Sequence, residues 1–415
     1  MLDAMTAAAL AAWTATVGPS CDGAKPVLQE YRMDAGHSIT EFSIRFAFSR
    51  VKGRITEGNG TILYDPVTPA ASSISVVLNT KSLDTGWPHR DEHLRTSDFF
   101  DVEKFPTIEF RSTRLSETGD GWNAEGDLTM HGVTKRVAIP FQFTQPPTRS
   151  PESRWMILNV AGSTRLSRLD FGILGGSAFN SWFDKARAAT MGDSVDIEIE
   201  LEGYWPDAAS QRSPQVEAAL QRIVANGVPS QIARLDSASR TWTPAQAAGY
   251  LTGYDYVVRA LIATCRIPDA AALAGALARL YPESHRAALI QAFTLGVSGD
   301  PAGADRKYAE GKRLFRPPVR DPNEKFPQDD DTWWYLDQLA RTAHELGYRA
   351  EVVPLARAIA ELYPQTARAM TTYGQALAAV GDAKGASTAY SRALEIDPRE
   401  SRAMEWRRRL GSATP

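Results

Sequence analysis

The sequence predicts two successive domains of different class, an all-β antiparallel barrel or sandwich followed by an all-α helical repeat array. Three observations support this division. Short segments that alternate between apolar and polar residues fill the first half, and tight-turn residues separate them. After Trp205 the composition shifts to Ala, Leu and Arg with helical spacing. In that second half, matching residues recur at intervals of 34 positions, as Pro364 and Pro398 do.

The overall composition limits the classes of protein that this chain can represent. Its 415 residues exceed one ordinary domain, and the 43% of hydrophobic residues are enough for packed cores. The formal net charge is -3, so we expect no nucleic-acid partner. No stretch approaches the roughly 20 consecutive apolar residues of a membrane-spanning helix, so we expect no transmembrane segment.

The N-terminal segment has part of the pattern of an export signal. Residues 4–18 are apolar and end in small residues, as the core of a signal peptide does. Asp3 precedes them without any Lys or Arg, although an export signal has positive charge there. Either the true start lies further upstream or the stretch is a leftover helix. We favour the first interpretation, in which residues 1–28 are a leader and the protein is periplasmic or otherwise exported; the alternative is a cytoplasmic protein.

Residues 29–205 contain the predicted strands. The first clear one places Phe42, Ile44, Phe46 and Phe48 on one buried face. Further strand-like runs cover 60–64, 74–78, 107–111, 123–130, 135–143, 155–163 and 195–202. In the last of these runs apolar and acidic residues alternate strictly. One face of this strand is therefore solvent-exposed, and the apolar face points into the lumen of a barrel. Two pieces are not strands: 92–100 is predicted to form a helical turn or two, and 172–189 a short helix or lid.

Residues 206–213 are predicted to be a polar linker, and 214–415 a helical repeat domain. The clearest repeat unit covers 367–400, and the unit at 333–366 has matching residues at the same offsets. Weaker units cover 251–284 and 285–318, and 214–250 is expected to cap the stack. The basic run at 407–409 is expected to be the solvated end of a helix, where cations suit the helix dipole.

The first half resembles the YceI-like family in blocks that follow one another in order. These blocks cover 31–42, 60–66, 82–101, 105–113, 126–135 and 168–172. The resemblance implies a lipocalin-like barrel over 29–205 whose long apolar pocket holds an isoprenoid chain, such as a polyprenyl phosphate or a quinone tail. It also implies export to the periplasm, which is common in the family. The second half resembles tetratricopeptide repeats, which implies a protein partner of unknown identity.

The candidate lipid-binding residues are large apolar side chains of the first domain. They are Phe42, Ile44, Phe46, Phe48, Phe99, Phe100, Phe110 and Phe171. Such a face often fills a barrel with its own side chains; alternatively it lines a lumen for an elongated ligand. The family resemblance favours the second interpretation. Burial of ligand methylenes, at roughly 0.8 kcal/mol each, would then bind the chain without a specific polar contact.

The stretch 82–110 combines these rings with a cluster of charges. Arg90, His93 and Arg95 are candidate donors to a phosphate or quinone oxygen at the cavity mouth. In the alternative, Arg90 and Asp91 pair with nearby groups and pin the loop across the barrel end. For these two residues we favour the alternative.

Metal and catalytic sites are not predicted. His89 and His93 lie four residues apart, but Pro88 precedes them and no third ligand is evident. The sequence has no GxSxG motif, no P-loop and no GxGxxG motif. We therefore expect no enzyme, no catalytic residue and no cofactor. The leading hypothesis is a barrel that binds, sequesters or carries an isoprenoid lipid, with a repeat domain that docks a protein. The alternative is a scaffold protein whose barrel is a filled structural module.

Overall fold

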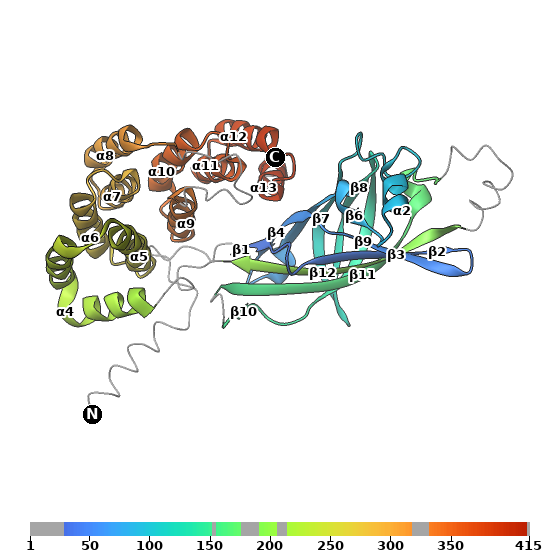
Figure 1. Ribbon diagram of the computed structural model, residues 1–415, viewed down its shortest axis with the longest axis horizontal. Helices are drawn as coiled ribbons and strands as arrows, with labels where there is room; N and C mark the ends of the chain where they lie inside the picture. The colour runs from blue at the N-terminus through green and yellow to red at the C-terminus, as the bar shows by residue number, and fades with distance from the viewer. Residues whose placement is uncertain (1–28, 152–154, 176–190, 206–213, 318–331, 413–415) are drawn as a thin grey trace, which may run out of the picture. The chain divides into compact units, whose positions relative to one another are not determined.

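The computed structural model describes residues 29–151, 155–175, 191–205, 214–317 and 332–412. These residues form two compact units. One unit holds the strands up to Trp205 together with the C-terminal segment from Asp397, and the other holds the helices between Pro214 and Ile396 (Figure 1). The predicted leader, the predicted linker and most of the predicted lid lie outside the described residues. No helix in the described part of the chain is long and apolar enough to cross a membrane.

The first unit is a closed eight-stranded antiparallel β-barrel, which confirms the predicted class. Its strands are β1 (Gln29–Met33), β2 (Ile39–Phe46), β3 (Ser49–Ile55), β4 (Gly58–Tyr64), β5 (Ser73–Asn79), β7 (Thr107–Thr118), β8 (Gly121–Met130), β9 (Val133–Phe143), β11 (Met156–Ser167) and β12 (Met191–Trp205). Because β1 and β2 both pair antiparallel with β12, they are two parts of one barrel strand. In the same way β3 and β4 are two parts of the next barrel strand, because they pair with β2 and β1. The short elements β6 (Leu83–Asp84) and β10 (Thr148–Arg149) pair antiparallel with the ends of β3 and β11.

Strand β12 closes the barrel because it has a partner on each side. It pairs with β11 from Trp205 to Ser194, and with β1 and then β2 on its other edge. At the break between β1 and β2 the side chain of Ser38 replaces a backbone partner, since its Oγ accepts the Glu202 N–H at 3.0 Å. The sheet therefore has no free edge along β12, and every second residue of its strands faces the lumen.

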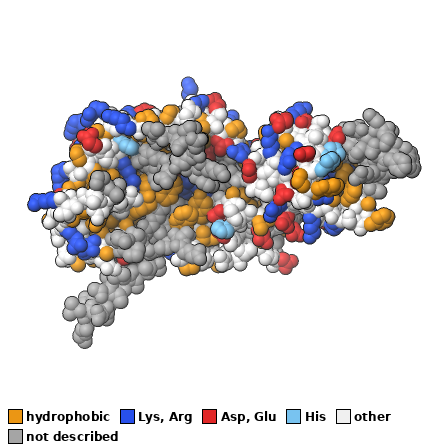
Figure 2. Space-filling model, in the orientation of Figure 1, with side chains coloured by type: hydrophobic (Ala, Val, Ile, Leu, Met, Phe, Trp, Pro, Cys, Tyr) orange, Lys and Arg blue, Asp and Glu red, His pale blue; other side chains and the backbone are white. Residues whose placement is uncertain are grey.

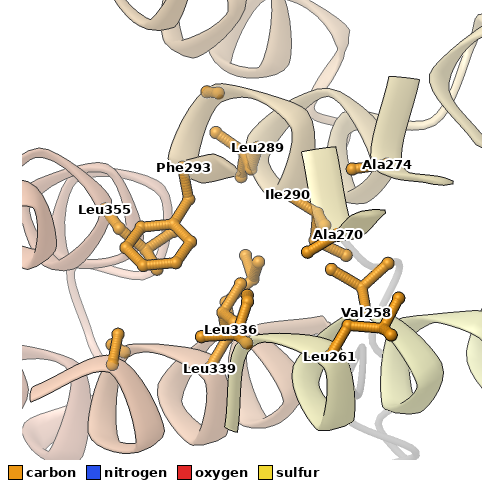
Figure 3. Packing of buried hydrophobic residues seen from close by; sticks show 14 of the residues in the cluster. Val258, Leu261, Ala270, Ala274, Leu289, Ile290, Phe293, Leu336, Leu339 and Leu355 are labelled. Atoms are coloured by element: carbon orange, nitrogen blue, oxygen red, sulfur yellow. The ribbon is translucent and has the colours of Figure 1, made fainter. Parts of the chain in front are cut away.

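The second unit consists of helices that pack in consecutive pairs. They are α4 (Pro214–Ala238), α5 (Pro244–Ala263), α6 (Ile267–Leu280), α7 (His285–Val297), α8 (Pro301–Leu314), α9 (Thr332–Glu345), α10 (Arg349–Leu362), α11 (Ala367–Ala379) and α12 (Ala383–Ile396). In the core, Leu289 and Phe293 of α7 pack near Leu336 and Leu339 of α9 (Figure 3). The unit is consistent with the predicted repeat domain.

A small residue in the repeat unit predicted at 367–400 lets the two helices of that unit pack closely, as expected. A Cβ atom on Gly374 of α11 would lie 2.5 Å from the ring of Tyr390 on α12, so only glycine lets these two helices approach so closely. Tyr390 is fully buried at this contact. The first helix of the weaker unit begins at Pro244, seven residues before the predicted start at 251.

The C-terminal helix α13 (Ser401–Ser412) belongs with the barrel, so the predicted repeat domain at 214–415 extends too far. The Nε atom of Arg402 lies 2.7 Å from a carboxylate oxygen of Glu30 on β1, and Ser401 shares a hydrogen bond of 2.8 Å with Thr61 on β4. Ser73 of β5 donates to Glu405 at 2.8 Å. Polar groups on three adjacent strands therefore hold this helix on the outer wall.

Glu405 is the centre of this contact. It is fully buried and accepts hydrogen bonds from Arg408, Arg409 and Ser73. Burial by itself would raise the pKa of Glu405, but the two arginines lower it below its ordinary value of 4.5. The buried Glu405 carboxylate thus stabilises the folded barrel unit above pH 4.5, and this stabilisation is lost as the pH falls through the lowered pKa of Glu405.

Only Arg407 of the basic run at 407–409 is exposed, so the run is solvated only in part, whereas the sequence suggested that all of it is solvated. Arg408 and Arg409 are both partly buried beside Glu405, and Arg409 also donates to Ser73 at 2.8 Å. For Arg408 and Arg409 the expectation was wrong because the sequence does not show that Glu405 and this helix pack against Ser73 on the barrel wall.

Substitution Glu405→Ala tests the docking of α13. We expect the barrel unit to lose about 1–3 kcal/mol of stability, because buried donors are left without their acceptor. Denaturant unfolding and hydrogen exchange of β4 and β5 measure the change. The control is Glu395→Ala on α12, which removes an exposed pair with Arg392 and should cost less than about 0.5 kcal/mol. Equal effects of the two substitutions would contradict the assignment of α13 to the barrel.

Candidate functional site

A deep apolar cavity occupies the barrel lumen. Its volume is about 210 Å³, and residues from every barrel strand line its wall. Inward residues such as Ile197 and Ile199 of β12 and Phe110 of β7 remain half-buried rather than buried, because they face this space. The apolar side chains of the barrel therefore do not fill it, in contrast to the self-filled alternative.

One end of the cavity is closed by an aromatic cluster. Tyr31 lies at its centre, fully buried, with ring centroids 6.3 Å from Tyr64 and 6.0 Å from Trp205. Phe143 follows at 5.8 Å from Tyr64 and at 5.7 Å from Trp122. These residues stand at the ends of β4, β9 and β12 and at the start of β8, so the strand ends themselves form the plug.

The other end of the barrel is crossed by helix α2 (Pro88–Arg95) and by the chain that follows β11 (Figure 1). Leu94 of α2, then Phe99 and Phe100, then Ile173 and Met191 line the cavity here. A Cβ atom on Gly175 would lie 2.3 Å from Met191 and 3.0 Å from Phe99, so glycine is needed where this connection passes over the rings. Its φ of +70° also requires glycine.

Five of the eight predicted lipid-binding residues line the cavity: Phe42, Ile44, Phe99, Phe100 and Phe110. Two of these rings lie over glycines of the neighbouring strands. A Cβ atom on Gly53 would come within 2.5 Å of the Phe42 ring, and one on Gly126 within 2.8 Å of the Phe110 ring. Glycines across the strand thus leave room for each ring to lie flat against the wall.

The other three predicted residues do not line the cavity. Phe171 is buried against Leu128 and Ile173 behind the wall. Phe46 is the last residue of β2, and Phe48 is fully exposed in the turn that follows. The inference from alternation was wrong for Phe48 because the strand ends at Phe46, and Ala47 enters the turn with a φ of 52°.

Arg90 and Asp91 act as the loop clamp that the sequence favoured. Asp91 is buried and accepts both the backbone N–H and the hydroxyl of Thr85. Arg90 donates to the Thr85 hydroxyl at 2.7 Å and to its carbonyl at 2.8 Å. The two charges therefore fix the start of α2 to the chain before it and do not point into the cavity.

His93 and Arg95 also have partners outside the cavity. Arg95 donates to the carbonyls of Lys81 at 2.9 Å and Leu83 at 2.5 Å, so it ties the end of α2 to β6. His93 is paired with Asp98 at 3.0 Å, and its ring meets Phe99 edge-on at 5.1 Å. None of the three predicted head-group residues lines the cavity as the structure describes it.

Arg168 is a cavity-wall residue that the sequence analysis did not single out. It is buried and donates to the carbonyls of Ile173, Leu174 and Gly192, and to the carboxylate of Asp193. Burial lowers the pKa of its guanidinium, against the opposing effect of Asp193. Most of its N–H groups are used to hold the chain after β11 against the start of β12. The signal available in the sequence was its place in the last family block, 168–172.

The histidine pair considered as metal ligands does not converge. His89 stacks near Trp87, with ring centroids 6.1 Å apart, while His93 turns to Asp98. A different group, Asp34, His37 and Glu202, places one potential ligand atom from each residue within 4.8 Å of the others. His37 and the two carboxylates are solvent-accessible there, and we assign no ion to them because exposed acids beside a histidine are common without one.

The fold and the cavity define a β-barrel with an apolar lumen that an aromatic cluster closes at one end. The YceI-like domain model matches residues 31–203. A UPF0312 protein of Vibrio cholerae is 36% identical over 174 residues, which are 40% of this chain and 82% of that protein. A UPF0312 protein of Vibrio vulnificus has the same identity and coverage. Through its barrel, the chain belongs to the YceI-like family.

Solved structures are similar to parts of the chain. The crystal structure of BcnA from Burkholderia cenocepacia is similar with a TM-score of 0.36 and 20% identity, over 41% of this chain and 98% of that one. The family match ends at residue 203, before the helical unit begins.

Substitution Asp91→Ala tests the clamp. We expect a loss of about 1–3 kcal/mol of stability, because Asp91 is buried and its removal leaves the Thr85 N–H without an acceptor. Thermal unfolding of the full chain measures it. Glu103→Ala, which breaks an exposed pair with Lys81 in the same loop, is the control and should have little effect. A stable Asp91→Ala protein that instead lost its ligand would assign the residue to binding.

Proposed function

We propose that the barrel binds, sequesters or carries a lipid with an isoprenoid chain, such as a polyprenyl phosphate or a quinone-like lipid. The observation that supports this most is the unfilled lumen, since a cavity of about 210 Å³ that runs along the barrel with an almost wholly apolar wall suits an elongated hydrocarbon. The choice of an isoprenoid rests on the resemblance to the YceI-like family. A solved domain from Saccharophagus degradans that is described as polyisoprenoid-binding is 14% identical.

The physical basis of the proposed binding is the burial of methylene groups. At roughly 0.8 kcal/mol per methylene, a five-carbon isoprene unit contributes about 4 kcal/mol before the costs of association. The polar members of the described wall are Thr40, Glu41, Thr164 and Arg168. The donors of Arg168 are largely used by the backbone, and the aromatic plug closes the far end. The ligand therefore enters chain first and leaves its polar head at the mouth.

The same wall supports a carrier and not an enzyme. Its polar groups are scattered over β2, β11 and the start of the connection after β11, and they do not form a nucleophile with an adjacent base. We propose neither a reaction nor a cofactor for the barrel. Export is part of the proposal, because residues 4–18 resemble the core of a signal; cell fractionation of the full chain decides it.

Filling the cavity tests the proposed ligand site. Val195 and Ile197 of β12 face the lumen, and Glu198 lies on the outer face of the same strand. The double substitution Val195→Trp with Ile197→Trp should displace about one isoprene unit and weaken binding by roughly a thousandfold. Extraction of the purified full chain followed by mass spectrometry measures the lipid that copurifies.

Glu198→Trp is the matched control, since it adds the same indole to the outside and should keep the lipid. Circular dichroism of both proteins establishes that the barrel is folded. Equal lipid content in the two proteins would place the ligand outside the lumen, and the absence of lipid from the wild-type chain would favour the scaffold alternative.

We also propose that the helical unit docks a protein partner. Polar side chains join the first helices of successive pairs: Asp255 of α5 pairs with Arg286 of α7, and Asp337 of α9 accepts from Thr372 of α11. These four side chains are buried and fix the spacing of the first helices, which in repeat arrays line the concave surface that binds extended peptides or partner helices. Residues of these first helices are therefore the place to look for the partner.

Site-specific crosslinking from the full chain tests the partner proposal. A photoreactive residue in place of Tyr373, on the first helix α11, should give one discrete protein adduct in the native host. The same residue in place of Arg392, exposed on the second helix α12, is the control. Adducts from Arg392 alone, or from neither position, would contradict the proposed docking face.

A further inference from the structure

Four large apolar side chains are exposed at the open end of the barrel, and we call them the apolar rim. They are Phe48, Leu174, Trp87 and Leu169, with 108%, 61%, 56% and 43% relative exposure. Each lies in a connection between elements: Phe48 between β2 and β3, Trp87 just before α2, and Leu169 and Leu174 after β11. At the opposite, closed end of the described barrel the exposed large apolar residue is Val67.

The rim is continuous with the cavity along the chain. Ile173 lines the cavity and Leu174 next to it is exposed, so the chain passes there from the lumen to the outer surface. Phe46, two residues before Phe48, pairs with Met191, which also lines the cavity. Figure 2 shows hydrophobic side chains at the barrel end that holds α2 and the β2–β3 hairpin. Exposed apolar groups of this size at a cavity mouth mark an interaction surface.

The charge of the hairpin points to the nature of the partner. Between Glu41 and Glu57 the chain contains four cations and no acid: Arg45, Arg50, Lys52 and Arg54. Arg50 and Arg54 are paired with Asp196 and Asp84, while Arg45 and Lys52 are exposed. Phe48 thus stands at the tip of a basic hairpin, a combination that fits an anionic lipid surface.

Trp87 has a similar combination of ring and cation. The Arg90 guanidinium lies over its indole at 5.5 Å, and the indole itself is more than half exposed. Tryptophan rings of this kind settle at the boundary between acyl chains and head groups, where an adjacent cation meets lipid phosphates. Trp87 therefore adds a second exposed ring beside a cation at the mouth, although Arg90 also donates to Thr85, and Glu92 and Asp170 are exposed nearby.

We infer that the apolar rim and the basic β2–β3 hairpin dock the barrel mouth on an anionic lipid bilayer, from which the cavity takes its ligand. This inference rests on the proposed lipid-binding function. Direct docking avoids the passage of a bare chain through water, which costs roughly 0.8 kcal/mol for each exposed methylene. A bilayer is favoured over a protein partner because exposed apolar side chains of the rim stand beside the exposed cations Arg45 and Lys52 of the hairpin.

Vesicle flotation of the purified full chain tests the docking. Vesicles of phosphatidylcholine with phosphatidylglycerol should bind the wild-type protein, and vesicles of phosphatidylcholine alone should bind it more weakly. The double substitution Phe48→Asp with Leu174→Asp should lower the binding roughly tenfold or more, because it removes two inserted groups and adds two charges. Val67→Asp, at the closed end, is the matched control and should bind as the wild type does.

The contribution of the basic hairpin to vesicle binding is tested separately. Arg45→Glu with Lys52→Glu should abolish the preference for phosphatidylglycerol, and added salt should weaken wild-type binding. Unchanged flotation of both double variants, or no flotation of the wild type, would overturn the inference. Lipid extracted from the same preparations separates the two proposals: copurified lipid without vesicle binding refutes the docking alone, and vesicle binding without copurified lipid refutes the cavity function alone.

Discussion

The closure of the sheet by β12 is the constraint on which the rest of the barrel depends. This strand pairs with β11 on one edge and with β1 and β2 on the other, so the sheet has no free edge and its radius is set by eight strands. A barrel of that size encloses more space than its inward side chains fill here, since rings such as Phe110 lie flat over glycine. The cavity is therefore a consequence of the closure, and α2 and the described chain after β11 line one end of it.

The two ends of this barrel are specialised by different kinds of contact. Aromatic rings around Tyr31 plug one end, whereas charged residues hold the connections at the other. Asp91 and Arg168 serve the backbone, and this leaves the chemistry of the mouth to exposed apolar and basic side chains. The helical unit is joined to the barrel unit by the chain at both ends, because α13 returns to the outer wall of β1, β4 and β5.

Much of the fold was predictable from the sequence, and the failures have physical causes. Period-two alternation and turn residues identified the strands, and the 34-residue period identified the helix pairs, because both signals are local. The face of Phe48 was predicted wrongly because a turn interrupts the alternation. The docking of α13 and the role of Arg168 depend on partners that lie far away along the chain, such as Glu30 and Gly192. The charged cluster around Arg90 was correctly favoured as a clamp, since carboxylates adjacent to arginines pair readily.

The most direct test of the central claim is a crystal structure of the purified full chain, solved without added lipid. The account predicts elongated density in the lumen, running from the aromatic plug at Tyr31 past Phe110 and Ile197, with its polar end at the mouth beside Phe99. A lumen closed by inward side chains, with no room left beside Phe110, would contradict it.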